Sequence, residues 1–553
     1  MLNSKEKRRF HFSYIAVPIG VFLLGLIVWQ FYKYRIVHQQ LDKTLSNKSG
    51  GLYSIHYEGL VLDEVRGILH VKNITIVPDT AIYRQMTEEH RNPPALIRIS
   101  IPALDILGVK TPKALLGKQI EGGKLLITNP AIVIELDHFS GDSTIYNPGK
   151  DLSKDLLGKL LKISLDSVEV AHAKVLVRDM GTKETTFSSD NVSFLLSDLL
   201  IDSIAIKDSS RILFSRNLDM SCNEIIFPTR NEKYRLHVEK LQFAGRENNF
   251  HIGRIGIVPQ LSEAAFAGSS PVQKDRYDFE MEGITLRNVV REGLWHKQIR
   301  ADSLIVNKSS FKVYRDLSYP RDTVSKVGRY PQQLLMRLHV PVNIKKMVFL
   351  HSFIEYKEKN AKSDSAGKLQ FFDVSGTFSN VTNMKAAIDR NNECTLLFRA
   401  KLLDKTPVDA RLVMLLKDPK GKFRIEGNIG GLDVVSLNGL TQPMGLTRME
   451  KGKIDNLHFD LRATDSQGEG KLIMLYSDLK ISLLKKDKKE NKYDKKGLAS
   501  LAANIFIKNS NPGKGENPRT AEMHFDRILD KSFFNLIWKT LFTGIKQTVG
   551  MKK

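Results

Sequence analysis

The sequence predicts a mainly β protein. We expect an N-terminal transmembrane helix followed by an elongated, curled antiparallel sheet, which forms a groove or incomplete barrel and carries a few short amphipathic helices. Three observations lead to this fold class. A β-pattern of about seventeen residues recurs at least four times, one apolar segment precedes it, and short alternating runs fill most of residues 55–484.

The repeated pattern begins at Ile120, Ile163, Ile299 and Val342. In each copy, alternating apolar residues stand before and after a short group of small or turn-favouring residues, so each copy predicts two short strands with a turn or bulge between them. Alternation places the apolar side chains on one face, which we expect to line the groove. These candidate groove residues are Leu125, Ile127, Ile132, Ile134, Val168, Val170, Val175, Val177, Leu304, Val306, Phe311, Val313, Met347, Phe349, Ile354 and Tyr356.

Residues 12–31 contain no charged side chain and are long enough to cross a bilayer as a helix. Lys5, Lys7, Arg8 and Arg9 precede them, so the positive-inside rule predicts a cytoplasmic tail at residues 1–11 and a body on the other side of the membrane. A cleaved signal peptide is the alternative, but no small-x-small cleavage site follows the apolar run.

Helices are expected at residues 33–45, 112–119, 151–162 and 331–338. A sheet with many strands curls because strands twist, and a curled apolar face could shelter acyl chains, since each buried methylene contributes about 0.8 kcal/mol. Periodicity alone fits an ordinary β-sandwich core equally well.

The formal net charge of +23 predicts attraction to polyanions, either nucleic acid or an anionic membrane surface. The expected topology places the basic surface outside the cytoplasm and no nucleic-acid-binding module is recognisable, so no nucleic-acid partner is predicted. The sequence contains no nucleophile elbow, His-Glu-x-x-His motif, Walker loop or dinucleotide fingerprint. We therefore predict no catalytic, metal-binding or cofactor-binding residue, no cofactor and no enzyme activity.

The two cysteines, Cys222 and Cys394, lie far apart in the sequence. In an oxidising compartment they could form a disulfide, and two buried free thiols are at least as consistent with the spacing.

The C-terminal region is basic, with 16 Lys and Arg against 7 Asp and Glu from Ile481 to Lys553. A helix is expected from Ser532, with an apolar side and flanking lysines, as in helices that lie at an anionic membrane interface. A helix that caps the end of the groove fits the same pattern. The candidate membrane-contact residues are Phe534, Ile537, Trp538, Leu541, Phe542 and Ile545.

Residues 431–486 resemble the C-terminal module of AsmA-like proteins of Gram-negative inner membranes. In that family a short helix ending in Leu-Asn precedes a Gly-Lys-hydrophobic strand, a strand with alternating polar positions, and a Gly-x-Gly-x-hydrophobic strand that closes on Tyr-x-Asp-Leu. The matching segments here are Leu437 and Asn438, Gly452–Ile454, Leu457–Leu461, Gly468–Leu472 and Tyr476–Leu479.

The resemblance implies a single-pass inner-membrane protein with a β-rich periplasmic body, one of a bridge-like group that moves phospholipid in outer-membrane biogenesis. The expected organisation is a tail at 1–11, an anchor at 12–31, a β-repeat body at 32–430, the AsmA-like module at 431–484, and a basic loop with an amphipathic helix at 485–553. The expected function is to hold or transfer phospholipid, with a possible outer-membrane or periplasmic protein partner. The alternative is an envelope scaffold that binds proteins through a sheet edge and carries no lipid. A hydrolase of envelope polymers is a distant third.

Overall fold

The computed structural model describes residues 49–551 apart from 50, 64, 111–118, 137–160, 206–207, 209, 212, 229–232, 292, 294–296, 362–364, 487–492 and 496–506. The predicted anchor at 12–31 and the predicted helix at 33–45 lie outside the described residues, as do positions 112–118 and 151–160 of the predicted helices at 112–119 and 151–162. The last residues of these two helices, Gln119 and Lys162, instead begin the strands Gln119–Thr128 and Lys162–Asp179. The described chain is mainly β and divides into two compact units, 1–230 with 238–248, and 231–237 with 249–553.

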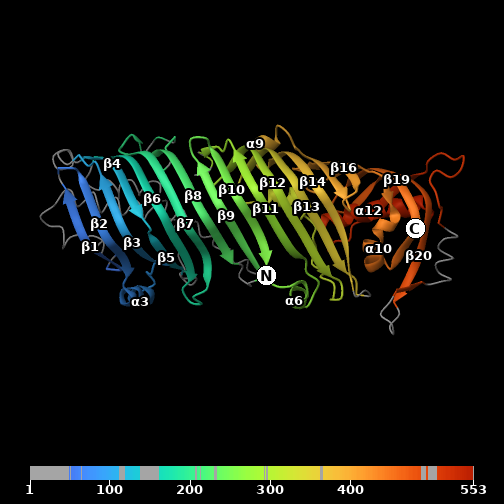
Figure 1. The fold of residues 1–553 in the computed structure, drawn as a ribbon, viewed down its shortest axis with the longest axis horizontal. Coiled ribbons are helices and arrows are strands. Elements are labelled where there is room, and N and C mark those ends of the chain that lie inside the picture. The colour runs from blue at the N-terminus through green and yellow to red at the C-terminus, as the bar shows by residue number, and fades with distance from the viewer. Residues whose placement is uncertain are drawn as a thin grey trace. The chain divides into compact units, whose positions relative to one another are not determined.

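The first unit is a mixed sheet with one helix on its described part (Figure 1). Its elements are β1 (Tyr53–Asp63), β2 (Ile68–Pro78), α3 (Thr80–Glu88), β3 (Ala95–Leu107), β4 (Gln119–Thr128), β5 (Ala131–Leu136), β6 (Lys162–Asp179), β7 (Thr185–Ile201) and β8 (Ser215–Pro228), while β9 (Tyr234–Ala244) holds residues of both units. Strands β1, β2 and β3 pair in order, β3 pairs with both β4 and β5, and these two pair with β6, which continues to β7 and β8.

The second unit contains the remaining strands and most of the helices. Its elements up to residue 402 are β10 (Asn249–Pro259), α6 (Glu263–Gly268), β11 (Arg276–Arg287), β12 (Ile299–Asp316), α8 (Pro331–Met336), β13 (Val342–Lys359), β14 (Ala366–Thr382), α9 (Lys385–Ile388) and β15 (Glu393–Leu402). The rest are β16 (Thr406–Leu415), β17 (Phe423–Ile429), β18 (Leu432–Asp433), the 3₁₀ helix η2 (Val434–Leu437), α10 (Asn438–Gly445), β19 (Thr447–Ala463), β20 (Gln467–Lys486), β21 (Tyr493–Lys495), β22 (Thr520–Asp526) and α12 (Phe533–Thr548). Strands β10 to β17 pair in sequence, and β17 continues to β19, β20 and β22.

The predicted all-antiparallel sheet is wrong, because the repeated copies pair with each other in parallel. β4 and β5 pair with β6, and β12 pairs with β13, so that equivalent repeat positions face each other. Examples are Leu125 with Val168 and Leu304 with Met347. A parallel pair needs a long connection that returns the chain to the same end, and residues 317–341, which include α8, make this return between β12 and β13.

The turn-favouring residues inside the copies form bulges. Asn129, His172 and His351 occupy the same repeat position and have positive φ angles of 52°, 59° and 44°. The extra residue changes the alternation by one, so the apolar side chains before and after it point to the same face. The expected pair of short strands is therefore realised as β4 and β5 in the first copy, and as one long bulged strand in β6 and β13.

The segments of the AsmA-like resemblance fall on regular elements of the second unit. Leu437 ends η2 and Asn438 begins α10, where its side chain exchanges hydrogen bonds with the backbone of Met449. The two expected strands Gly452–Ile454 and Leu457–Leu461 are parts of one strand, β19, and both later segments lie on β20. The expected helix at 331–338 is α8, which begins at Pro331 as predicted.

Candidate functional site

In the first unit, the candidate groove residues belong to a buried hydrophobic cluster. Val168, Val170, Val175 and Val177 of β6 are between 2% and 6% exposed. They join one cluster of buried side chains that reaches from β1 to β8. The other members of the predicted set on this unit are Leu125, Ile127 and Ile134, which are buried, and Ile132, which is partly buried.

In the second unit, most equivalent positions are partly exposed. Val306 is fully buried, whereas its parallel neighbour on β13, Phe349, is partly exposed. The same intermediate exposure is found at Leu304, Phe311, Val313, Met347, Ile354 and Tyr356. The parallel pair β12–β13 thus presents an apolar face that its own core does not fully cover, and we call these eight residues together the β12–β13 face.

Aromatic side chains from the neighbouring strands extend this face. The ring of Phe349 lies 6.1 Å from that of Phe378 on β14, edge to face. Phe311 contacts two rings of β11, with centroid distances of 5.9 Å to Phe279 and 6.4 Å to Tyr277. Aromatic rings offer large apolar area at low cost in conformational entropy, so the β12–β13 face is suited to contact with hydrocarbon.

Charged side chains end the face at the C-terminal ends of β12 and β13. Arg315 donates two hydrogen bonds to Asp275, at 2.6 and 2.7 Å. The hydroxyl of Tyr356 donates to the carboxylate of Glu358, and burial, reinforced by that carboxylate, raises the pKa of Tyr356 far above its ordinary value. The apolar surface therefore meets a paired polar cluster instead of continuing to the strand ends.

The return segment 317–341, which we call the strap, joins this polar end to the last strands of the unit. The Arg321 guanidinium pairs with Asp530, and the Lys326 amide donates to the Leu529 carbonyl at 2.7 Å. Further along, Tyr330 is fully buried between Phe423 of β17 and Phe533 of α12, with centroid distances of 5.7 and 5.1 Å. The strap, which runs from the end of β12 to the start of β13, thus also contacts the start of α12.

Arg527 contacts the strap through the ring of Tyr330 and through the backbone carbonyl of Lys326. Its guanidinium lies 4.4 Å from the ring centroid of Tyr330 and donates to the backbone carbonyls of Asp465 and Lys326. The side chain is only 7% exposed and its Nε makes no hydrogen bond within the described part of the chain. Sequence reasoning did not identify Arg527 or Tyr330, because no local pattern marks a contact between residues two hundred positions apart.

Helix α12 covers the sheet beyond the strap. Ser532 caps it as predicted, and Phe533, Leu536, Thr540, Gly544 and Thr548 face the sheet. The packing is close, since a Cβ on Gly544 would lie 2.7 Å from Met523 Cγ. Of the six candidate membrane-contact residues, Ile537, Leu541 and Ile545 pack against this core, and Phe534, Trp538 and Phe542 are exposed. One side of α12 therefore covers the sheet, and the other side exposes apolar residues to solvent.

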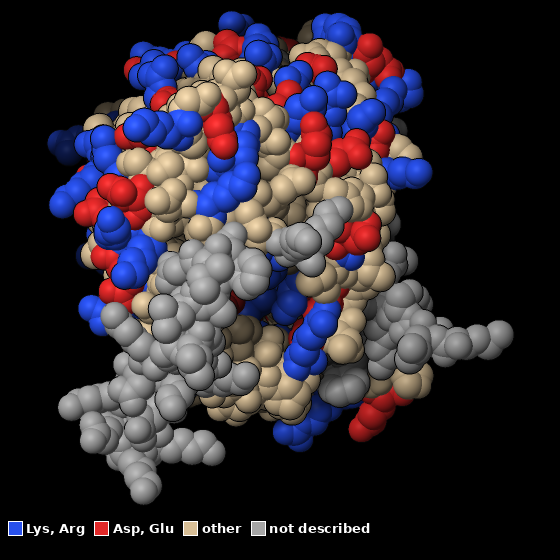
Figure 2. All heavy atoms as spheres, turned by 90° about the vertical axis from the view of Figure 1, so that its right-hand side faces the viewer, with Lys and Arg blue, Asp and Glu red and all other residues tan. Residues whose placement is uncertain are grey.

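The face of the second unit that carries β19 and β20 bears both signs of charge. Figure 2 shows Lys and Arg side chains mixed with Asp and Glu, with uncharged surface between them. Opposite charges also pair across neighbouring strands of this unit, as Arg424 of β17 does with Asp460 of β19, at 2.6 Å. Where this face is described, its Lys and Arg side chains do not form one uninterrupted basic patch.

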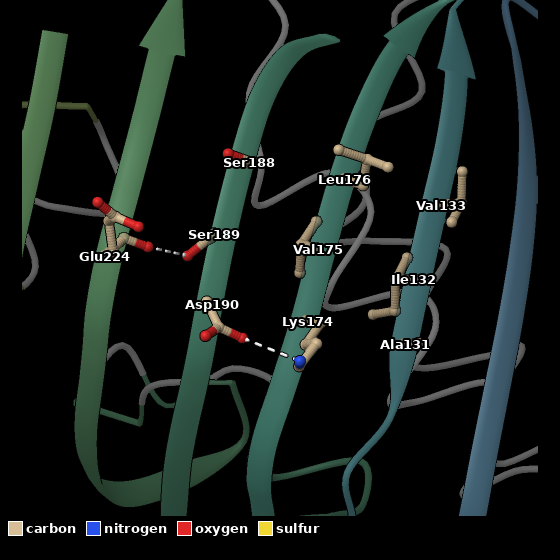
Figure 3. Close-up of a pocket in the computed structure, with 10 residues that line it drawn as sticks. All are labelled: Ala131, Ile132, Val133, Lys174, Val175, Leu176, Ser188, Ser189, Asp190 and Glu224. Carbon is tan, nitrogen blue, oxygen red and sulfur yellow. Dashed lines mark hydrogen bonds and ion pairs between the residues drawn. The ribbon is translucent and has the colours of Figure 1, made fainter.

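A cavity of about 320 Å³ lies in the first unit, where β5, β6, β7 and β8 run side by side (Figure 3). The β6–β7 register shifts at Ala173, the residue before Lys174 in the cavity lining. Two candidate groove residues, Ile132 and Val175, line it, and the Lys174–Asp190 ion pair, at 3.6 Å, lies beside it. Its volume is at the lower end of the range for small-ligand sites, and its lining combines apolar and charged groups.

Both cysteines are buried free thiols, one in each unit. Cys222 lies 3.0 Å from the Ser189 hydroxyl, and burial raises its pKa. Burial alone raises the pKa of Cys394 to about 11. In both cases the raised pKa disfavours the thiolate, which is the nucleophilic form of cysteine. The part of the chain with assigned positions holds no group of three His, Cys, Asp or Glu side chains placed to bind a metal ion.

None of the helices with assigned positions is both long enough and apolar enough to cross a bilayer. No protein-family model matches the chain, and no curated protein matches it.

Proposed function

We propose that this protein holds or transfers phospholipid in outer-membrane biogenesis, anchored in the inner membrane by residues 12–31 with its β-body in the periplasm. The observation that carries the proposal is the partly exposed β12–β13 face, where Met347, Phe349 and Ile354 place apolar surface beside the aromatic rings of β11 and β14. In the first unit most of the same repeat positions are buried. The resemblance of residues 431–486 to the C-terminal module of AsmA-like proteins supports the same function.

Acyl chains fit this face for a thermodynamic reason. Each methylene that leaves water contributes about 0.8 kcal/mol, so a chain lying along several strands gains binding free energy without specific polar contacts. The Arg315–Asp275 pair, whose side chains are 14% and 11% exposed, supplies polar groups at one end of the face, where a lipid head group could lie. We therefore place the bound lipid on the second unit, between β11 and β14.

Native mass spectrometry of the full-length protein, released from nanodiscs of defined lipid, tests this proposal. We expect phospholipid adducts on the wild type and their loss from Phe349→Asp and Ile354→Asp. The matched control is Val348→Asp, since Val348 has intermediate exposure on the same strand but points to the opposite face. A lipid-free wild type, or equal lipid loss in the control, would contradict the proposal.

The second candidate function is an envelope scaffold without lipid transport. It is favoured by the self-filled cores of the first unit and of the α12 region, where side chains of this chain occupy the positions that a lipid would need. If the wild type carries no lipid, crosslinking of the full-length protein to envelope proteins is the next experiment, because a strand at a sheet edge can accept a partner strand.

A further inference from the structure

Helix α12 carries a second apolar stripe that its own fold leaves uncovered. Phe534, Trp538 and Phe542 follow one another at intervals of four residues and therefore share one side of the helix. Their exposed fractions are 69%, 47% and 38%. We call these three residues the outer stripe.

The opposite side of α12 shows that the helix is firmly attached to its sheet. Leu536 is 1% exposed and Thr540 is fully buried. Gly544 allows the helix backbone to approach β22 closely, and the cap at Ser532 accepts a hydrogen bond from the Asn535 amide. A helix fixed this firmly holds the outer stripe in a constant position on the surface.

The surroundings of the outer stripe are cationic. The rings of Trp538 and Phe542 stack with centroids 5.6 Å apart, and the ammonium groups of Lys539 and Lys546 lie 6.0 and 5.5 Å from the centroid of Phe542. From Ser532 to the end of the chain the sequence has 4 Lys and no Asp or Glu. Any surface that meets the outer stripe therefore also meets lysine side chains, and this segment has no acidic side chain to pair with them.

This combination matches the chemistry of an anionic bilayer surface. Trp and Phe side chains enter the boundary between head groups and acyl chains, while lysine stems extend along apolar surface and keep the ammonium groups at the phosphates. Each Lys near an anionic surface adds to the attraction, and the effect falls off within a Debye length.

We propose that the outer stripe of α12 docks the second unit on a bilayer that contains anionic phospholipid, while the inner side of the helix remains packed on its sheet. Docking needs no lipid on the β12–β13 face, so the proposal is independent of lipid transfer. It also assigns different roles to the two sides of α12, with Ile537, Leu541 and Ile545 stabilising the fold and the outer stripe contacting the bilayer.

Vesicle co-flotation tests the proposal with the full-length protein held in nanodiscs of phosphatidylcholine. Target vesicles contain either phosphatidylcholine alone or phosphatidylcholine with phosphatidylglycerol. The triple variant Phe534→Ser, Trp538→Ser, Phe542→Ser removes the outer stripe. The matched control removes three other exposed apolar side chains of the same unit, Leu334, Leu338 and Leu397, which are 48%, 51% and 54% exposed, by the same change to Ser.

We expect the wild type and the control to float with the anionic vesicles, and the outer-stripe variant to bind them at least about tenfold more weakly. Binding should weaken as salt rises, because surface charges are screened. Equal flotation of the wild type and the outer-stripe variant would overturn the proposal, as would equal binding of the wild type to both kinds of vesicle.

Fluorescence quenching locates the contact directly and separates a membrane from a protein partner. The sequence has 3 Trp, so a Trp29→Phe, Trp295→Phe background leaves Trp538 as the only indole. Phospholipids brominated on their acyl chains should quench Trp538 in anionic vesicles. Unquenched Trp538 on vesicles that the protein binds would overturn the proposal and point to a protein partner for the outer stripe.

Discussion

Strands β6 and β13 are copies of one local unit, yet they serve different purposes in their two units. Val170 and Val175 on β6 are 6% and 3% exposed, whereas Phe349 and Ile354, at equivalent positions on β13, are partly exposed. The copies share their alternation, their bulge position and a parallel partner strand. The difference therefore comes from what surrounds each copy, and it shows that a repeat of this kind specifies a face without specifying whether that face is covered.

Two variants that place the same charge in both copies test this difference, and they should give the largest effect. Val170→Asp puts a carboxylate into a closed core, and we expect a loss of about 4 kcal/mol or more in unfolding free energy, because the buried charge has no partner. Phe349→Asp should lower the unfolding free energy by only about 1–3 kcal/mol, because the aspartate can reach water. Urea unfolding followed by circular dichroism measures both, with Arg178→Asp on the exposed face of β6 as control. Equal losses in the two variants would remove the distinction between the copies.

A second variant sharpens the contrast within the second unit, between the β12–β13 face and the region covered by α12. Gly544→Leu forces a side chain against Met523 and Leu472, whose nearest atoms lie 2.7 and 3.1 Å from the position of a Cβ. We expect a loss of about 1–3 kcal/mol from overpacking. Limited proteolysis should then release the C-terminal region first. A variant as resistant as the wild type would show that α12 contributes little to the stability of its unit.

The two cysteines make it possible to follow each unit separately. Cys222 reports on the first unit and Cys394 on the second, and both are buried thiols with raised pKa. A thiol whose folded pKa is raised stays protonated, so labelling at pH 8 should be slow until the unit opens. We expect Val170→Asp to accelerate labelling of Cys222 more than that of Cys394, measured by mass spectrometry of the labelled peptides. Equal acceleration would mean that the two units unfold together.

The smallest expected effect concerns the strap, which the first unit lacks among its described residues. The hydrogen bond from Arg321 holds the pKa of Asp530 below its ordinary value. A lowered pKa stabilises the fold above the unfolded pKa of about 4, and this contribution disappears as pH falls through the folded pKa. Asp530→Asn should therefore lose less than about 1 kcal/mol at pH 7, and the difference from the wild type should shrink below pH 4. A difference independent of pH would exclude the ion pair as its cause.

The sequence predicted the strands and the shared apolar face of the copies, because alternation reports directly which side chains lie together. It did not predict the parallel pairing of β4 and β5 with β6 or of β12 with β13, since both pairing modes need the same alternation. Helix α3 was missed although Asp79 caps it, because its nine residues bury little apolar surface. For α12, the sequence showed apolar residues on more than half of the circumference, so it could not decide which of them faced the sheet.

The sequence also could not predict which side chains are buried and which are exposed to solvent. The strap buries Tyr330 by bringing it to Phe423 and Phe533, and no local pattern at Tyr330 distinguishes it from an exposed turn residue. The bulges did leave a signal, since Asn129, His172 and His351 interrupt apolar alternation with residues that tolerate positive φ. The same interruption in the sequence of another chain should therefore indicate a bulged strand.

The in-register parallel pairing relates the two copies of each pair by a simple translation. Leu304 faces Met347 and Val306 faces Phe349, so β12 and β13 present matching positions to each other, whereas their outer neighbours β11 and β14 pair with them antiparallel. One further copy, inserted with its connection between β12 and β13, would meet a matching parallel neighbour on each side, as in repeat proteins whose units contact only their neighbours. The length of the apolar face can therefore change by gene duplication in whole units, without a new packing solution at each step.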